Sequence, residues 1–434
     1  MTALDGRTGR PLWGYRRSLE AEARNCCGVV NRGLAVLDDA VYLATLDARL
    51  VCLDADTGTE RWVVDVADYR TGYAITVAPL AVRDKIIVGV SGGEFGIRGF
   101  LDAYDARTGK RAWRFWTVPG PGEAGHETWG SGDAWKTGGA PTWVTGTYDP
   151  KLNLLYWGTG NPSPDMDGDD RPGDNLYSDC VVALDVDTGA RRWHFQYTPH
   201  DLHDWDSNQV PMLVDGSIDG QPRRLLVHAN RNAFYYVLDR ETGEFLHGSE
   251  FAMQNWARGL DRQGRPIRVP GMAPTMDGIL VYPGVDGAVN WPSSSYSPST
   301  GLVYLQATEN YGQVYFKRKD EYDPGKPFYG GSVRNVFGQE PLGVIKALEV
   351  TTGRLRWQFE EHAPSLAGVL TTAGGVLFSG TKEGQVFVLD AQTGRPLWHF
   401  ATGGAVCGGP VSFLIDGRQH LAVTAGTGLF VFGL

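Results

Sequence analysis

One pattern, repeated seven times along the chain, constrains the fold more than any other feature of the sequence. Each copy has an apolar run, an acidic residue, a Thr-Gly pair that begins three residues later, and a closing aromatic residue. Because glycine supplies the positive φ that a tight turn needs, each copy is predicted to be a β-hairpin. The copies are ALDGRTGRPLW ending at Trp13, CLDADTGTERW at Trp62, AYDARTGKRAW at Trp113, ALDVDTGARRW at Trp193, VLDRETGEFLH at His247, ALEVTTGRLRW at Trp357 and VLDAQTGRPLW at Trp398.

The spacing of the hairpins predicts a β-propeller. The turn glycines are separated by 49, 51, 80, 54, 110 and 41 residues, and about 40 to 50 residues form one four-stranded blade. We expect the step of 80 to hold an insertion and the step of 110 to hide a blade whose motif has decayed. The prediction is an all-β, eight-bladed propeller formed by one domain, residues 1–434, with tryptophan-docking motifs and an incomplete first blade.

The recurrent tryptophan is expected to wedge between neighbouring blades, which is a structural role. Function is therefore expected in the loops that interrupt the repeat.

Composition excludes several classes of function. The formal net charge of −10 argues against a nucleic-acid partner, because phosphate contacts need clustered Lys and Arg. No apolar run is long enough to span a bilayer. The five cysteines form no CxxC pair and no CxxCH haem-attachment site. The N-terminal residues have neither the basic nor the apolar region of a signal peptide.

Two adjacent cysteines, Cys26 and Cys27, stand in the stretch NCCGVVNRG. Neighbouring α-carbons lie about 3.8 Å apart, closer than an unstrained disulfide prefers. From the residues alone, a buried free cysteine beside a solvent-facing one is the simpler interpretation.

Three irregular stretches offer oxygen ligands for a metal ion. Glu94 lies in SGGEFGIRG after an apolar strand, and Asn161 lies in YWGTGNPSP. The stretch YTPHDLHDWDSN places Asp201, Asp204 and Asp206 within six residues. Carboxylates this close repel one another unless a cation or a proton offsets their charge, and oxygen ligands without a thiolate indicate a hard ion. Taken alone, the last stretch is equally well explained as a solvated acidic loop.

These stretches together resemble the quinoprotein alcohol dehydrogenases, the pyrroloquinoline quinone (PQQ) dependent methanol and ethanol dehydrogenase family. The resemblance covers the whole chain. It rests on CCGVVNRG, SGGEFGIRG, GDAWKTGG, GTGNP, TPHDLHDWD and VLTTAGGVLFSGT. It implies an eight-bladed propeller with PQQ in the central channel over a metal ion.

The resemblance also implies a set of cofactor-binding residues. Cys26 and Cys27 are expected to form a vicinal disulfide on one face of the quinone, with Trp143 stacked on the other face. The remaining cofactor contacts that it implies are Arg32, Thr76, Ser91, Gly92, Gly93, Arg231 and Asn290.

The implied metal ligands are Glu94, Asn161 and Asp204, and Asp204 is also the expected catalytic base. The cation is expected to polarise a quinone carbonyl while the base takes the alcohol proton and hydride passes from the substrate to PQQ. Asp206, two residues beyond the base, matches an extra aspartate of lanthanide-dependent members. We therefore expect a lanthanide as the metal in preference to Ca²⁺.

The function predicted from these features is oxidation of a primary alcohol to the aldehyde by a periplasmic enzyme. Electrons are expected to pass to an external acceptor such as cytochrome c, since the chain has no haem motif, and a homodimer is a further possibility. The alternatives are a non-catalytic propeller scaffold, a truncated or decayed paralogue, and a dehydrogenase for sugars, polyols or polyvinyl alcohol. The chain begins at a docking motif that other strands precede in relatives, so we expect an open edge between the first and last blades.

Overall fold

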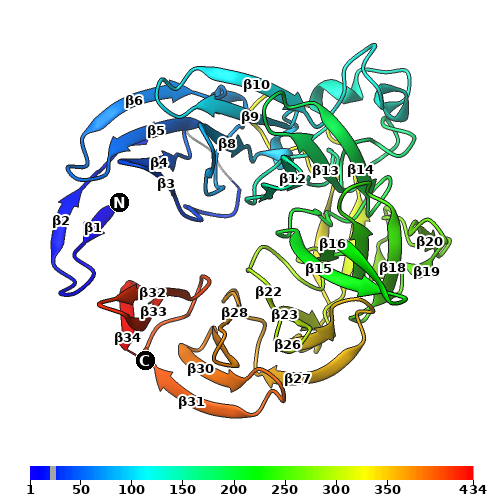
Figure 1. Cartoon of the computed structure of the whole chain (residues 1–434). Helices are drawn as coiled ribbons and strands as arrows, with labels where there is room; N and C mark the ends of the chain where they lie inside the picture. Colours follow the sequence, from blue (N-terminus) through cyan, green and yellow to red (C-terminus); the bar gives the residue numbers. More distant parts are fainter. Residues whose placement is uncertain (20–25, 434) are drawn as a thin grey trace. The chain divides into compact units, whose positions relative to one another are not determined.

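The computed structural model describes residues 1–19 and 26–433, and over these residues the protein is an all-β structure (Figure 1). The eight sheets that follow one another along the chain pair their strands antiparallel, and the helices in the described residues are four short 3₁₀ turns. The prediction of an all-β fold is confirmed. No helix in the described part of the chain has the length and apolarity that crossing a bilayer requires.

Eight sheets follow one another along the chain and account for the repeat. Their strands are β1 (Thr2–Leu4) and β2 (Pro11–Gly14); β3 (Ala35–Leu37), β4 (Ala40–Ala44), β5 (Arg49–Asp54) and β6 (Glu60–Asp65); β7 (Leu80–Val82), β8 (Lys85–Gly89), β9 (Phe100–Asp105) and β10 (Arg111–Trp116); β11 (Thr147–Asp149), β12 (Leu154–Gly158), β13 (Cys180–Asp185) and β14 (Arg191–Gln196); β15 (Met212–Ile218), β16 (Gln221–Ala229), β17 (Phe234–Asp239) and β18 (Phe245–Glu250); β22 (Ser295–Ser297), β23 (Leu302–Glu309), β26 (Leu342–Glu349) and β27 (Leu355–Glu361); β28 (Leu370–Thr371), β29 (Val376–Gly380), β30 (Gln385–Asp390) and β31 (Pro396–Ala401); and β32 (Val411–Ile415), β33 (Arg418–Ala425) and β34 (Gly428–Gly433).

Two smaller sheets and the 3₁₀ turns lie between these repeats. The small sheets are β19 (Ala257–Leu260) with β20 (Pro266–Arg268), and β21 (Ile279–Val281) with β24 (Gln313–Lys317) and β25 (Gly331–Asn335). The 3₁₀ turns are η1 (Tyr69–Thr71), η2 (Gly93–Phe95), η3 (His126–Trp129) and η4 (Ala134–Thr137).

The described chain divides into two compact units. Unit 1 contains Met1–Asn208, Ala273–Ile279 and Tyr315–Ser332, and unit 2 contains Gln209–Met272, Leu280–Val314 and Val333–Leu434. Apolar side chains of β3 to β14 form one core in unit 1, and those of β15 to β18 with the sheet of β22 form another in unit 2. That residues 1–434 act as one domain stays a prediction.

The eighth sheet is not where the spacing of the motifs predicted it. The step of 110 residues holds one blade, β22–β23–β26–β27, together with the two small sheets, so it hides no decayed blade. The apolar run after Tyr296 is β23, the second strand of that same blade, which made it look like a separate repeat. The eighth sheet is instead β32–β33–β34, which has no motif of its own. The step of 80 residues does hold insertions, and the first sheet is indeed incomplete.

The acidic residue and the threonine of the motif shape its turn. In the second copy, Asp54 Oδ1 accepts hydrogen bonds from the backbone N–H and the hydroxyl of Thr57, both at 2.9 Å. The glycine two residues before the second strand, Gly58, has φ +70° and donates to the Asp54 carbonyl at 2.9 Å. The local pattern therefore closes the hairpin without help from the rest of the fold.

The tryptophan of one copy docks on the turn of the next copy. Trp62 donates to the Ala106 carbonyl at 3.3 Å, and a Cβ added to Gly109 would lie 2.9 Å from the Trp62 ring. Trp13, Trp113 and Trp357 make the same hydrogen bond to Ala55, Val186 and Ala391, at 3.0, 3.0 and 3.1 Å. His247 occupies the equivalent position and its Nε2 lies 2.9 Å from the Thr352 carbonyl. For these copies the predicted structural role of the aromatic residue is confirmed.

We predict that Gly109→Ala destabilises the protein more than Gly301→Ala does. Both glycines have φ +69°, but no described atom lies within 4 Å of a Cβ at Gly301, whereas a Cβ at Gly109 meets the Trp62 ring. The positive φ alone costs about 1 kcal/mol, and crowding of the docked ring adds about 1 to 3 kcal/mol. Urea unfolding of the two variants measures the difference, and equal free energies of unfolding would contradict the docking role.

Candidate functional site

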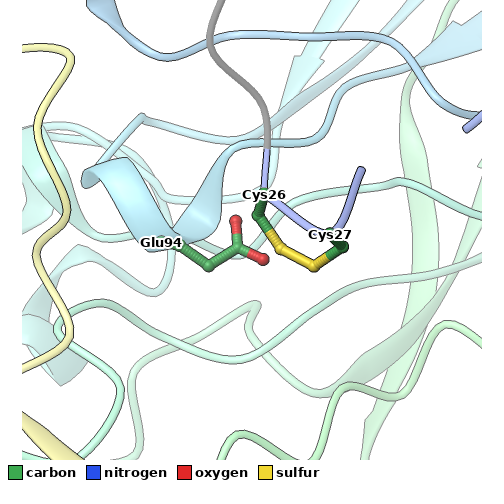
Figure 2. Close-up of side chains that lie close together, drawn as sticks. All are labelled: Cys26, Cys27 and Glu94. Carbon is green, nitrogen blue, oxygen red and sulfur yellow. A yellow bond between two sulfur atoms is a disulfide. The ribbon is translucent and has the colours of Figure 1, made fainter. Parts of the chain in front are cut away.

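Cys26 and Cys27 form a disulfide, and the Glu94 carboxylate lies against it (Figure 2). The two sulfur atoms and a Glu94 oxygen all lie within 4.8 Å of one another. The simpler interpretation of two free cysteines is therefore wrong, and the pairing implied by the family resemblance is confirmed. Because disulfide sulfurs carry no thiolate charge, Glu94 is the charged group of this cluster, and its role as a metal ligand stays a prediction.

The backbone around Glu94 is folded tightly before the side chain reaches the site. Ser91 pairs with Ala74 through N–H···O bonds of 2.8 and 3.2 Å, and its hydroxyl donates to the same carbonyl at 3.0 Å. Gly92 has φ +118°, and a Cβ there would overlap the Gly72 carbonyl. Only glycine fits this position, and the turn of η2 that follows carries Glu94.

Asn161 and Asp206 are in direct contact although 45 residues separate them. Asp206 Oδ1 accepts the Asn161 backbone N–H at 3.2 Å and the Asn208 amide at 3.2 Å. The Asn161 side-chain nitrogen donates to Asp165 Oδ1 at 2.9 Å, and Asn161 Oδ1 lies 3.9 Å from a Cβ built on Gly93. The side-chain oxygen of Asn161 is therefore held close to Gly93, the residue before Glu94.

The three aspartates of the acidic loop, Asp201, Asp204 and Asp206, differ in burial and in their hydrogen bonds. Asp201 is fully buried and accepts the backbone N–H groups of His203 and Trp205 at 3.0 and 2.7 Å, so it holds the loop together. Burial opposes ionisation of Asp201, but its bonds to His203 and to these backbone groups leave the carboxyl with a lowered pKa. Asp206 is buried against Asn161, and Asp204 is less buried and has φ +60°.

Arg32 and Trp143, two of the expected cofactor contacts, lie against each other. The Arg32 guanidinium carbon lies 4.6 Å from the centre of the Trp143 ring, a cation–π distance. Arg32 also donates to the Thr76 carbonyl through its backbone N–H at 3.2 Å and its side chain at 3.4 Å. Burial lowers the pKa of Arg32 to about 10, and the charge of Asp206 opposes this shift. The guanidinium remains charged at neutral pH and is suited to an anionic group.

Arg231 and Asn290 belong to unit 2 and share a neighbour there. Arg231 Nε and the Asn290 amide both donate to the Asp286 carbonyl, at 3.4 and 3.0 Å. A Cβ at Gly287 would lie 2.5 Å from Arg231 Cβ, so this turn packs on the arginine. Their roles toward a cofactor stay predictions.

Buried acids outnumber buried bases around Asn161 and Asp206. Burial, with the charges of Glu94 and Asp206, raises the pKa of Asp165 well above its ordinary value. Burial, with Asp201 and Asp206, raises that of Asp179, whose carboxylate oxygens have no hydrogen-bond partner among the described residues. The fully buried Arg171, which donates to the Asp201 carbonyl at 2.8 Å, offsets only part of this charge. A bound cation would relieve the remainder.

Sequence reasoning missed several residues of this site. Asp165 lies four residues after Asn161 in the irregular stretch NPSPD, and that spacing was the available signal. Asp179 and Arg171 stand in loops with no repeat and no motif, so only the folded structure brings them near the acidic loop.

We predict that Gly160→Ala weakens binding of a hard cation at least tenfold. A Cβ at Gly160 would overlap Asp206 Oδ1 and push that carboxylate away from the Asn161 backbone. Equilibrium dialysis with La³⁺ and with Ca²⁺ measures the affinity. Gly132→Ala is the control, because no described atom lies within 4 Å of its Cβ and no positive φ is involved. Unchanged affinity in a folded Gly160→Ala protein would contradict the arrangement of Asp206 and Asn161.

Comparison with known protein families supports the resemblance found in the sequence. Residues 1–254 match the family model described as glucose/ethanol/alcohol dehydrogenase, beta-propeller domain. Residues 342–432 match the model described as outer membrane protein assembly factor BamB.

Individual relatives agree with the first match. The chain is 40% identical over 452 residues to the quinoprotein alcohol dehydrogenase PedH of Pseudomonas putida, covering 98% of this chain and 75% of the relative. It is 37% identical to a lanthanide-dependent methanol dehydrogenase of Methylacidiphilum fumariolicum, covering 96% and 72%. The solved quinohemoprotein alcohol dehydrogenase of Comamonas testosteroni matches with a TM-score of 0.93 and 37% identity, covering 99% and 68%.

The chain spans about 64 to 75% of the length of such curated relatives. The propeller fold and the enzyme class expected from the sequence are confirmed by these matches. The chain belongs to the PQQ-dependent, or quinoprotein, alcohol dehydrogenase family.

Proposed function

We propose that the protein oxidises a primary alcohol to the aldehyde with PQQ as cofactor and one hard cation as partner of the cofactor. The observation that carries this proposal is the Glu94 carboxylate lying against the Cys26–Cys27 disulfide, together with the contact between Asn161 and Asp206. The side-chain oxygen of Asn161 lies 3.9 Å from a Cβ built on Gly93, the residue before Glu94. Bound PQQ supplies a quinone that accepts two electrons, and the cation supplies Lewis acidity.

The residues present fit a planar, anionic cofactor. The disulfide and the Trp143 ring are flat or apolar surfaces, and Arg32 offers a charge-assisted hydrogen bond to a carboxylate. Gly92 and Gly93 have no side chain, so their backbone can be approached closely by a bound cofactor. A Cβ at Gly93 would also crowd the Pro141 ring, at 3.1 Å. These contacts support the cofactor-binding roles expected from the sequence.

The donor set also fits a hard cation. Glu94 and Asp206 supply carboxylate oxygens and Asn161 supplies an amide oxygen whose orientation Asp165 fixes. Asn208 adds a buried amide oxygen that has no hydrogen-bond partner among the described residues. No sulfur or nitrogen ligand competes in this set, which favours an oxygen-seeking ion.

We infer that Asp204, the residue that matches the catalytic base in the family resemblance, takes the alcohol proton. The base has to stand beside both the cation and the cofactor, since the alcohol binds between them. Asp206 lies against Asn161 and its charge acts on Arg32, so Asp206 is proposed as a ligand of the cation.

We predict that Asp204→Asn lowers kcat about 10²- to 10⁴-fold, because an amide cannot accept the proton. Asp206→Asn is expected to weaken cation binding, because it removes a carboxylate of the donor set, but its kcat is expected to stay within about tenfold of the parent once metal is saturating. Steady-state kinetics of both variants, after saturation with PQQ and metal, give the comparison. The reverse order of effects would give the role of base to Asp206.

The surplus of negative charge favours a lanthanide over Ca²⁺. Burial, with the charges of Glu94 and Asp206, raises the pKa of Asp165, and burial, with the charges of Glu94, Asp165 and Asp204, raises the pKa of Tyr329. Four carboxylates that share one region are balanced better by a trivalent than by a divalent ion. The lanthanide-dependent methanol dehydrogenase among the relatives is in keeping with this choice.

Reconstitution tests the proposed function directly. Apo-protein is mixed with PQQ and either La³⁺ or Ca²⁺, and its ultraviolet-visible spectrum is followed on titration with ethanol and then with methanol. We expect uptake of the quinone, its reduction by a primary alcohol, and higher activity with La³⁺. Activity with Ca²⁺ alone would contradict the metal preference, and failure to take up PQQ would contradict the function.

The same experiment separates the alternatives. A scaffold would need neither the Glu94 carboxylate against a vicinal disulfide nor the buried contact between Asn161 and Asp206, so the non-catalytic interpretation is not favoured. Sugars, polyols and polyvinyl alcohol are tested as further titrants. We also infer a periplasmic location, an external acceptor such as cytochrome c, and a possible homodimer, as expected from the sequence.

A further inference from the structure

One segment far along the chain returns to the candidate site. Residues Tyr315–Ser332, which we call the strap, belong to unit 1, although the residues before and after them belong to unit 2. The strap begins next to residues 273–279, where Phe316 pairs with Thr275 and the Lys317 N–H donates to the Thr275 carbonyl at 2.9 Å. No motif of the sequence marks this segment.

The strap is bonded to the residue that carries the first proposed ligand. The Phe328 N–H donates to the Glu94 carbonyl at 2.7 Å. The Phe328 ring packs over the turn that follows, since a Cβ at Gly96 would lie 3.0 Å from it, and Tyr322 lies beside it with ring centres 5.5 Å apart. The end of η2 is therefore enclosed by the strap.

The strap is also bonded to the segment that orients Asn161. Met166 donates its N–H to the Tyr329 carbonyl at 2.9 Å, and its neighbour Asp165 accepts the Asn161 amide at 2.9 Å. Gly330 has φ +66°, and a Cβ there would lie 2.8 Å from Asp167 Cβ. The strap and this segment therefore touch at backbone distance.

Ion pairs strengthen this second contact. Lys317 Nζ lies 3.2 Å from Asp167 Oδ1 and 2.5 Å from Asp169 Oδ2. The Asp167 side chain is only 6% exposed, so this pair is screened less than a surface ion pair. Lys319 pairs with Asp170 at 2.5 Å in the same way.

A third contact reaches the acidic loop. Tyr315, which is fully buried, donates its hydroxyl to the His203 carbonyl at 3.3 Å, and its ring meets the His203 ring edge-on at 5.1 Å. The His203 ring in turn stacks on the Trp205 ring, with ring centres 4.4 Å apart. Trp205 lies between Asp204 and Asp206 in the sequence. The strap thus contacts the three segments that supply Glu94, Asn161 and Asp206.

We propose that the strap is a positioning element that sets the spacing of Glu94, Asn161 and Asp206 around a hard cation; the inference rests on the proposed cation site. The three ligands come from separate loops, and their carboxylates repel one another before a cation binds. The strap is hydrogen-bonded to all three loops and therefore opposes that repulsion. Gly330 and Lys317 are the strap residues through which this effect is tested.

Terbium luminescence tests the proposal without any turnover. Tb³⁺ stands in for the cation, nearby tryptophans sensitise it, and its decay in H₂O and D₂O counts its bound waters. We expect Gly330→Ala to weaken Tb³⁺ binding at least tenfold and to add about one bound water, because one protein ligand is displaced. Gly338→Ala is the matched control: its φ is +75° and no described atom lies within 4 Å of its Cβ. Both changes cost similar backbone strain, and the contact of the new Cβ with Asp167 is expected to lower the thermal midpoint of Gly330→Ala further.

A second pair of variants keeps the test decisive if Gly330→Ala fails to fold. Lys317→Met removes the ion pairs to Asp167 and Asp169, and is expected to weaken Tb³⁺ binding about threefold to tenfold. Lys326→Met is its control, since Lys326 lies on the same strap but pairs only locally with Asp323, at 2.6 Å.

The outcomes separate this inference from the proposed function. A parent protein that binds no Tb³⁺ would overturn the cation site itself. A parent that binds Tb³⁺, with affinity and hydration unchanged in folded Gly330→Ala and in Lys317→Met, would overturn the role of the strap alone.

Discussion

The contact between an indole ring and the turn glycine of the following repeat is the interaction on which the rest of the structure depends. It combines a hydrogen bond with close packing of the ring on a glycine. One example is the bond from Trp113 to the Val186 carbonyl, at 3.0 Å. Because the turn is closed by its own Asp and Thr, the receiving surface is already rigid when the ring docks. Sheets joined in this way leave their connecting loops free to carry chemistry.

Charge is the second constraint, and it acts in those loops. Asp165, Asp179, Asp201 and Asp206 are buried close to one another, and Arg171 is the fully buried base among them. Burying several carboxylates together is unfavourable unless protons, hydrogen bonds or a cation compensate. The protein uses backbone N–H groups at Asp201, an amide at Asp165, and the Asn161 N–H and the Asn208 amide at Asp206.

Much of the fold could be predicted from the sequence because the repeat is local. The hairpin is decided by residues within a few positions of one another, and the docking aromatic recurs at a fixed offset. The eighth sheet was misplaced because β32 to β34 have no motif, while β23, a strand of the blade in the long step, looked like part of a separate repeat.

The site was predictable only as far as its residues stand in motifs. Cys26, Cys27, Glu94 and Asn161 do, and the first three lie together in the structure. The different roles of Asp201 and Asp206 depend on which backbone groups each carboxylate meets, and the strap is brought to the site by the fold alone. Neither the roles of these two aspartates nor the place of the strap can be predicted from the spacing of residues in the sequence.

The offset between the docking ring and its acceptor has an evolutionary consequence. Since the repeats of Trp62 and Trp113 each donate an indole and receive one, duplicating or deleting such a unit conserves the number of matched partners, whereas a break inside a unit leaves a ring or a turn without its partner. Gene recombination at the boundary between units is therefore tolerated most easily. His247 reaches the Thr352 carbonyl, whereas the carbonyl equivalent to the indole acceptors, that of Val350, accepts the Tyr235 hydroxyl, so the joint is made differently there.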